Sequence, residues 1–355
     1  GTIALSTGTS SLGSSGQFIV ETGDATNGRG GDIIYQVGAG DSGTGGDVKI
    51  TAGETSAKKS AGGELLIKAG AGTSADKNNG GSGGAVVIDG GEALGSGDHD
   101  TGGHINIKGG PAAAGTGGQI TIASGTSDQA SSGSVSVYTA DAGTEGVSGA
   151  ILVASGTASS GTSGEISIST GDAHNGQGGS ISLSVGDGTQ GPGGNILISA
   201  GYTEDIATRG QVNIATGSSD KTSSGQITME TPNAGEDGTS GAILLSTGTA
   251  SQGMSGSIHV ETGSATGGSG GGITMQVGDA YPSSDSEKVS GGHVLLNAGS
   301  TSARESKGGN VQISAGAGLN PSESDGGNGG LVNIAGGAAK GESTTDTGGS
   351  ITLKG

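Results

Sequence analysis

Histidines, which can carry out acid–base or metal chemistry, are few and scattered along this chain. Its five histidines are His99, His104, His174, His259 and His293, and none lies in the His-Glu-x-x-His spacing of a zinc-binding helix. The chain has no cysteine, which excludes thiolate nucleophiles, thiolate metal ligands and disulfides. We therefore predict that the protein is not an enzyme and has no catalytic residues.

Calcium is the one metal for which the sequence offers ligands. Asp98 and Asp100 flank His99 in a polar loop, and calcium binds carboxylate and carbonyl oxygens in such turns. The nine-residue glycine-rich repeat of calcium-binding β-helices is absent, so solvation of the surface is the competing interpretation. We expect no cofactor, with calcium at Asp98 and Asp100 as the alternative.

The composition and net charge of the chain limit the classes of partner that it can bind. The chain has 355 residues, of which 84 are glycine, and its net charge is −19 from 33 acidic and 14 basic residues. This charge repels phosphate backbones, which bind clustered lysine and arginine. Since no apolar run approaches the roughly 18–20 residues of a membrane span, we expect neither a nucleic-acid partner nor a membrane span.

One short pattern repeats along the whole chain. The structural element that it forms must position any functional residues. EISISTGDAHNGQGG begins at Glu165 and SISLSVGDGTQGPGG begins at Ser180; each has two alternate apolar residues, then a small residue, then a turn that closes on glycine. The first apolar column runs from Ile3 to Ile351, and the second from Leu5 to Leu353. Alternation with β-branched residues is strand spacing, so the pattern predicts one short strand in each repeat.

Short strands at a fixed period predict a stacked fold. We expect an all-β protein: a single elongated parallel β-solenoid of about 22 short coils over residues 1–355, without helices. The two apolar columns would face a thin core, and glycine would turn the corners. The small residue after each strand recurs in one order, beginning Thr or Ser, then Thr, Val and Ala, which divides the chain into blocks 1–149, 150–241 and 242–355, the last truncated.

Between the two apolar columns lies a position that the solenoid would turn outward. In eight repeats it is a large apolar residue, and exposed apolar residues in a line indicate a contact surface. The candidate interaction residues are Ile19, Ile34, Leu66, Val87, Leu152, Leu197, Leu244 and Leu295. A scatter of tolerated leucines is the alternative interpretation.

The run SGTSGEISISTGDAHNGQGGSISLSVGDGTQGPGGNILISAG resembles the glycine-, serine- and threonine-rich tandem repeats of surface proteins of diatoms and other marine microalgae. It is also similar to bacterial filamentous-haemagglutinin adhesins, although their coils are wider. The resemblance implies an extracellular or cell-surface location and a fibrous role. With it we expect a structural protein that forms a stiff fibre, filament or stalk and self-associates head to tail or laterally.

Two other functions stay open at this point. A cell-surface adhesin stalk would bind glycans or surfaces, with extracellular polysaccharide as its partner. An ice-binding solenoid would show a ladder of threonines, but the outward position before the turn reads Ser6, Glu21, Gln36 and Thr51. Since both chain ends lie on predicted strands, we also expect this chain to be a segment of a longer fibre.

Overall fold

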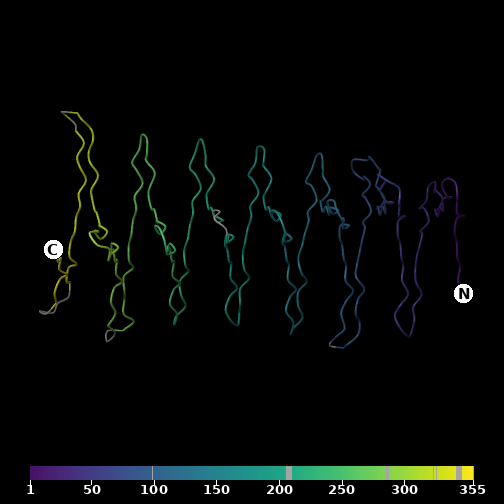
Figure 1. The fold of residues 1–355 in the computed structure, drawn as a ribbon, viewed down its shortest axis with the longest axis horizontal. Helices are drawn as coiled ribbons and strands as arrows, with labels where there is room; N and C mark the ends of the chain where they lie inside the picture. The colour runs from purple at the N-terminus through teal and green to yellow at the C-terminus, as the bar shows by residue number, and fades with distance from the viewer. Residues whose placement is uncertain are drawn as a thin grey trace. The chain divides into compact units, whose positions relative to one another are not determined.

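The computed structural model of the chain describes residues 1–97, 99–204, 210–284, 288–322, 324, 326–340 and 346–354. Within these ranges there is no helix and no strand, only extended segments, bends and turns. Figure 1 shows the chain as a succession of narrow loops, drawn without helix ribbons or strand arrows. The chain divides into two units, Gly1–Ile181 and Ser182–Gly355, and the loops described below occur in both.

The predicted all-β solenoid is therefore wrong, and the backbone hydrogen bonds show why. Every backbone–backbone hydrogen bond recorded among the described residues joins two positions of one loop, as from the Gly63 amide to the Gly53 carbonyl at 2.8 Å. A parallel solenoid requires the opposite pattern, with a ladder of bonds between successive coils. The glycine-rich segment after each apolar stretch returns the chain to its own loop, and no layer is built on the one before.

The apolar columns predicted to form a core are exposed. Ile166 and Ile168 expose 50% and 75% of their surface, and no hydrophobic residue in the described part of the chain is buried. β-branched residues favour strands because they pack against neighbours on a pleated surface. Without a neighbouring segment, that preference for extended backbone creates no core.

The least exposed described residues are small, and most of them follow an apolar stretch. Ala52, Ala69, Gly109, Ser124 and Thr139 are partly buried, whereas almost every other described residue is exposed. Their position identifies the point at which each loop begins. What burial the chain has is therefore concentrated where a loop closes, and the apolar columns contribute little of it.

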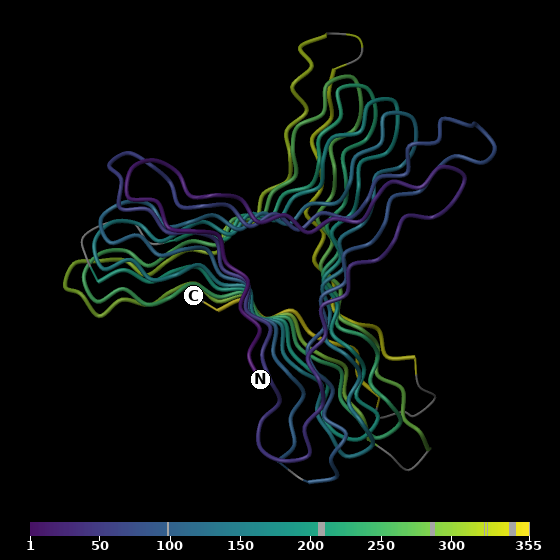
Figure 2. The same ribbon diagram turned by 90° about the vertical axis from the view of Figure 1, so that its right-hand side faces the viewer.

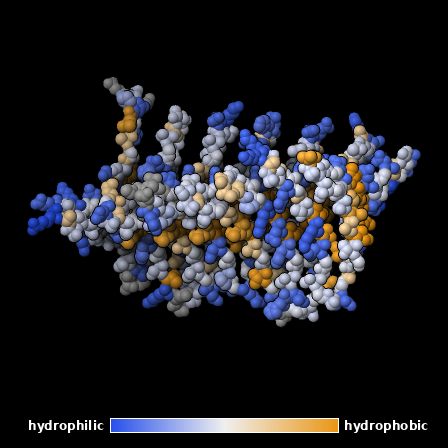
Figure 3. Space-filling model, turned by 45° about the vertical axis from the view of Figure 1, so that its right-hand side comes forward, coloured by the Kyte–Doolittle hydropathy of each residue, from blue (hydrophilic) through white to orange (hydrophobic). Residues whose placement is uncertain are grey.

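The total surface agrees with this open arrangement. The chain exposes 35202 Å², whereas a folded monomer of 33.0 kDa exposes about 12,500 Å² and an extended chain about 48,000 Å². Figure 3 shows hydrophobic side chains, coloured orange, at the surface between paler and bluer loops. Large apolar side chains that normally leave water on folding remain in contact with it.

Candidate functional site: loop necks and exposed apolar triplets

Each repeat contains a closed loop whose ends meet at a neck. We define the neck as the small residue after the apolar stretch, the residue that follows it, and the glycine that closes the loop. In the loop after Ile50 these are Ala52, Gly53 and Gly63, and a Cβ added to Gly63 would lie 3.2 Å from the Gly53 nitrogen. Figure 2 shows the two arms of the loops running side by side toward their tips.

Most necks whose small residue is Ala, Gly or Ser close through the backbone. The amide of the closing glycine donates to the carbonyl of the residue after the small one, at 2.7–3.3 Å. The closing glycines that make this bond are Gly63, Gly84, Gly103, Gly118, Gly133, Gly210, Gly309, Gly330 and Gly349, together with Gly225, whose neck has Thr216 as its small residue. In the Gly90–Gly103 and Gly109–Gly118 necks the two backbones approach so closely that a Cβ at Gly90 or Gly109 would collide with the opposite carbonyl.

Most necks whose small residue is Thr close through the side chain. Thr22 Oγ1 donates to the Gly31 carbonyl at 3.2 Å, and Thr262 Oγ1 donates to that of Gly271 at the same distance. Thr170, Thr216, Thr231 and Thr247 make the same contact with their own closing glycines. The hydroxyl gives these loops a bond across the neck between two groups that face each other.

In necks whose small residue is Val, the valine side chain crowds the closing glycine. A Cβ added to Gly46 would lie 2.7 Å from Val37 Cγ1, and one added to Gly194 or Gly292 would lie 2.6 Å from the matching valine. Real Cβ atoms do not approach this closely, so only glycine closes such a loop. The small residue of each repeat therefore indicates how the neck of its loop closes.

Matching loops also share the positions at which the backbone is left-handed. Asn27 and Asn175 occupy the same place in two loops and have φ of 59° and 62°, and Gly267 holds that place in a third loop with φ of 81°. Lys59 and Glu305, likewise equivalent, have φ of 60° and 57°. Left-handed backbone favours glycine and asparagine, so the first pair fits its conformation and the second is strained.

Between successive necks lies an exposed apolar triplet, which we define as the first apolar residue, the middle residue and the second apolar residue. In the eight repeats singled out above, the middle residue is itself large and apolar, and it is as exposed as the rest or more so; Leu197 exposes 88% of its surface. All eight are exposed to solvent, and their role as an interaction surface stays a prediction.

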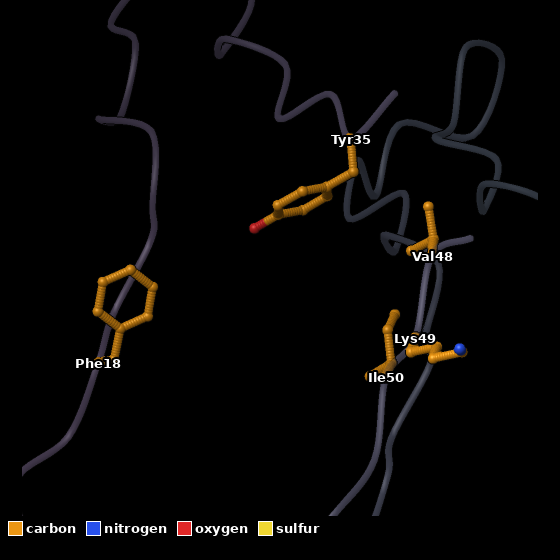
Figure 4. A pocket seen from close by; sticks show the side chains of 5 residues that line it. All are labelled: Phe18, Tyr35, Val48, Lys49 and Ile50. Carbon is orange, nitrogen blue, oxygen red and sulfur yellow. The ribbon is translucent and has the colours of Figure 1, made fainter. Parts of the chain in front are cut away.

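The first unit contains a pocket that was not predicted from the sequence. Phe18, Tyr35, Val48, Lys49 and Ile50 line a hollow of about 570 Å³, and Figure 4 shows the two aromatic rings separated across it. Lys49 Nζ lies 2.9 Å from Asp47 Oδ2, with both side chains exposed. The sequence feature that could have indicated this pocket is the pair of aromatic residues in successive repeats. The chain has a single phenylalanine and only four tyrosines.

The candidate calcium residues are only partly described. Asp98 lies outside the described residues, whereas Asp100 Oδ2 accepts a hydrogen bond from the Gly97 amide at 3.0 Å. The Asp100 amide in turn donates to the Gly97 carbonyl at 3.0 Å. Among the residues that the structure describes, no three His, Cys, Asp or Glu side chains form a group able to hold a metal ion.

Another carboxylate has a clear structural role. Asp76 Oδ1 accepts hydrogen bonds from the Asn79 and Asn78 amides at 2.9 and 2.8 Å. These bonds, that from Asn79 first, hold the pKa of Asp76 below its usual value because they favour the ionised form. The side chain thus shapes the tip of the loop closed by Gly84.

The described part of the chain contains no helix long and apolar enough to cross a membrane. No protein-family model, no curated protein and no solved structure matches this chain. The resemblance to algal surface repeats and to bacterial adhesins therefore stays a prediction.

Proposed function

We propose that this chain is a structural, non-catalytic protein that forms an extracellular fibre or surface stalk. The observation that supports it is the recurrence of one local unit, an exposed apolar triplet followed by a neck-closed loop, throughout both parts of the chain. A row of equivalent units offers many equivalent weak contacts, and linked contacts hold an assembly far more strongly than any single one.

The rest of the proposal follows from the surface. The polar loops keep an extracellular fibre hydrated, and the net charge of −19 repels nucleic acid and anionic lipid. We propose that the chain needs no cofactor. Calcium serves as a control, since adding it, or removing it with a chelator, should leave assembly unchanged unless Asp98 and Asp100 hold the ion.

Electron microscopy of the purified chain tests the proposal. We expect filaments or elongated assemblies, together with a rise in light scattering as concentration increases. Discrete monomers that turn over a glycan substrate would overturn the structural proposal in favour of an enzyme.

The aromatic pocket favours one second candidate, an adhesin stalk that binds extracellular polysaccharide. Phe18 and Tyr35 expose 62% and 73% of their surface, and aromatic rings provide apolar contact area with little loss of conformational entropy. The test is a polysaccharide pull-down with F18A and Y35A, using Y138A at a tyrosine outside the pocket as the matched control. Equal binding by all four proteins would reject this candidate.

A further inference from the structure

The apolar triplets present hydrophobic side chains on two sides of the chain. In extended backbone, successive side chains point in opposite directions, so Leu66 projects away from Leu65 and Ile67. All three residues are exposed. A partner lying on one side would therefore cover the outer pair of the triplet and leave the middle residue in water.

Repeats differ in whether that second side is apolar. In the repeats of Leu152, Leu197, Leu244 and Leu295 the middle residue is a leucine, whereas Ser167 and Ser182 hold the same place in other repeats. The polar examples show that the repeat tolerates serine there. The leucines thus mark triplets in which both sides require a covering surface.

The exposed area is too large for a small ligand to cover. The chain exposes 35202 Å², nearly three times the roughly 12,500 Å² of a folded monomer of its mass. A stable protein–protein interface buries about 1,600 Å² in total, so several such interfaces fit within the excess. The missing surface must come from an extended partner that can follow the chain over many repeats.

A second copy of the chain meets that requirement directly. The partner must present apolar groups at the spacing of the triplets, and another copy does so because both copies carry the same repeat. The triplets themselves are almost free of charge, with Lys49 and His259 as charged or titratable middle residues. Contact between triplets therefore buries little charge, although the loops of both copies are acidic.

Taking the structural role proposed above as given, we infer that the apolar triplets are the surface through which one copy of this chain binds another. The leucine-type middle residues are the contacts added on the second side of each triplet. A copy with those residues made polar keeps the outer pairs and loses the second side, so it assembles more weakly.

The experiment measures the mass of the full 355-residue chain by sedimentation over a range of concentrations. The variant combines Leu152→Ser, Leu197→Ser, Leu244→Ser and Leu295→Ser, which copies the residue that other repeats carry. The matched control combines L152I, L197I, L244I and L295I, which keeps the four positions apolar. We expect the serine variant to need at least about tenfold more protein to associate, while the isoleucine control stays near the unsubstituted chain.

Three results would separate the inference from the function on which it rests. If the original chain associates and the serine variant associates equally well, the triplet surface is wrong while the fibre proposal stands. If the original chain stays monomeric and cosediments with phosphatidylcholine vesicles, lipid covers the triplets and a second copy does not. If it stays monomeric and ignores vesicles, both proposals fail.

An NMR measurement shows whether the serine variant keeps its loops closed. The Gly118 and Gly309 amides donate across their necks at 2.8 Å, and their NMR signals report whether those loops remain closed. We expect the signals of the serine variant to match those of the original chain at low protein concentration. Weaker association with closed loops supports the inference, whereas weaker association with opened loops overturns it.

Discussion

The glycine that closes a loop is crowded by a residue of its own loop. Sequence reasoning attributed the closing glycines to the corners of a solenoid. In the structure the neighbour of Gly46 is Val37, and that of Gly63 is the Ala52–Gly53 backbone. Glycine is needed at these positions mainly because the two arms of a loop meet there.

Gly46→Ala should open its loop. The new Cβ would lie 2.7 Å from Val37 Cγ1, and such overpacking costs about 1–3 kcal/mol. The measurement is the nuclear Overhauser effect between the Val37 methyl groups and the α-protons of residue 46, which should disappear. Gly45→Ala is the matched control, because a Cβ there meets nothing within 4 Å.

A second substitution should restore the loop. Adding Val37→Ala to G46A places at the neck the alanine that Ala52 and Ala69 provide in other loops. If G46A keeps the original signal, or if G45A loses it as well, the crowding at this neck is not what requires glycine.

Acid should open the tip of the loop that contains Asp76. The closed loop lowers the pKa of this carboxyl below its ordinary 3.8, chiefly through the Asn79 amide and then that of Asn78. The ionised carboxylate therefore stabilises the loop above pH 3.8, and that contribution disappears as the pH falls through the lowered pKa. The NMR shifts of both amides should follow this titration, and Asp76→Ala should abolish it.

The third block supplies an internal control for this titration. Ser322 takes the place of Asp76 in the matching loop, where its amide donates a hydrogen bond to the neutral Asn320 Oδ1. The Ser322 amide should therefore show no titration over the same range. Parallel shifts in both loops would indicate a general effect of acid and would contradict the role given to Asp76.

At the scale of the element, the sequence predicts loops better than strands. The closing glycines and the order of small residues are visible in single repeats, and both correspond to necks in the structure. These features are local, since the partners Thr22 and Gly31 are separated by nine positions. Strand pairing requires contacts between repeats, and the alternation of Ile166 and Ile168 carries no information about where their neighbours lie.

The same distinction applies to the candidate site. The exposed middle residues were read from the sequence on the assumption that their flanking columns were buried, yet Ile166 is half exposed as well. Alternation identifies two sides of an extended chain. Which side is covered depends on packing, and packing is absent from the pattern.

Thr22→Val should weaken one class of neck. Valine has the shape of threonine but cannot make the 3.2 Å bond from Oγ1 to the Gly31 carbonyl, and such a bond contributes about 0.5–1.5 kcal/mol. The carbonyl-carbon shift of Gly31 should move toward its open-loop value. Thr22→Ser keeps the hydroxyl and should leave that shift nearly unchanged; a valine variant that also keeps it would show that the hydroxyl does not close the loop.

At the scale of the whole molecule, two opposing forces set the behaviour of the chain. Exposed apolar triplets favour contact with another surface, whereas the net charge of −19 opposes contact between copies. The described ion pairs, such as Arg29 with Asp32, join residues two or three positions apart in the sequence and lie on exposed side chains, so they do little to offset that repulsion. Assembly should therefore depend strongly on solution conditions.

Salt and acid should promote self-association. Repulsion between acidic loops acts over a Debye length of about 30 Å at 0.01 M salt and about 3 Å at 1 M, so adding sodium chloride removes the opposing force and leaves the triplet contacts. Lowering the pH toward the sequence pI of about 4.4 reduces the net charge and should act in the same direction.

Cooling should dissociate the assemblies, because hydrophobic contacts weaken at low temperature. Light scattering across salt, pH and temperature measures all three trends. Dissociation by salt would instead show that ion pairs between copies hold the assembly, and the apolar triplets would then not be its main contact.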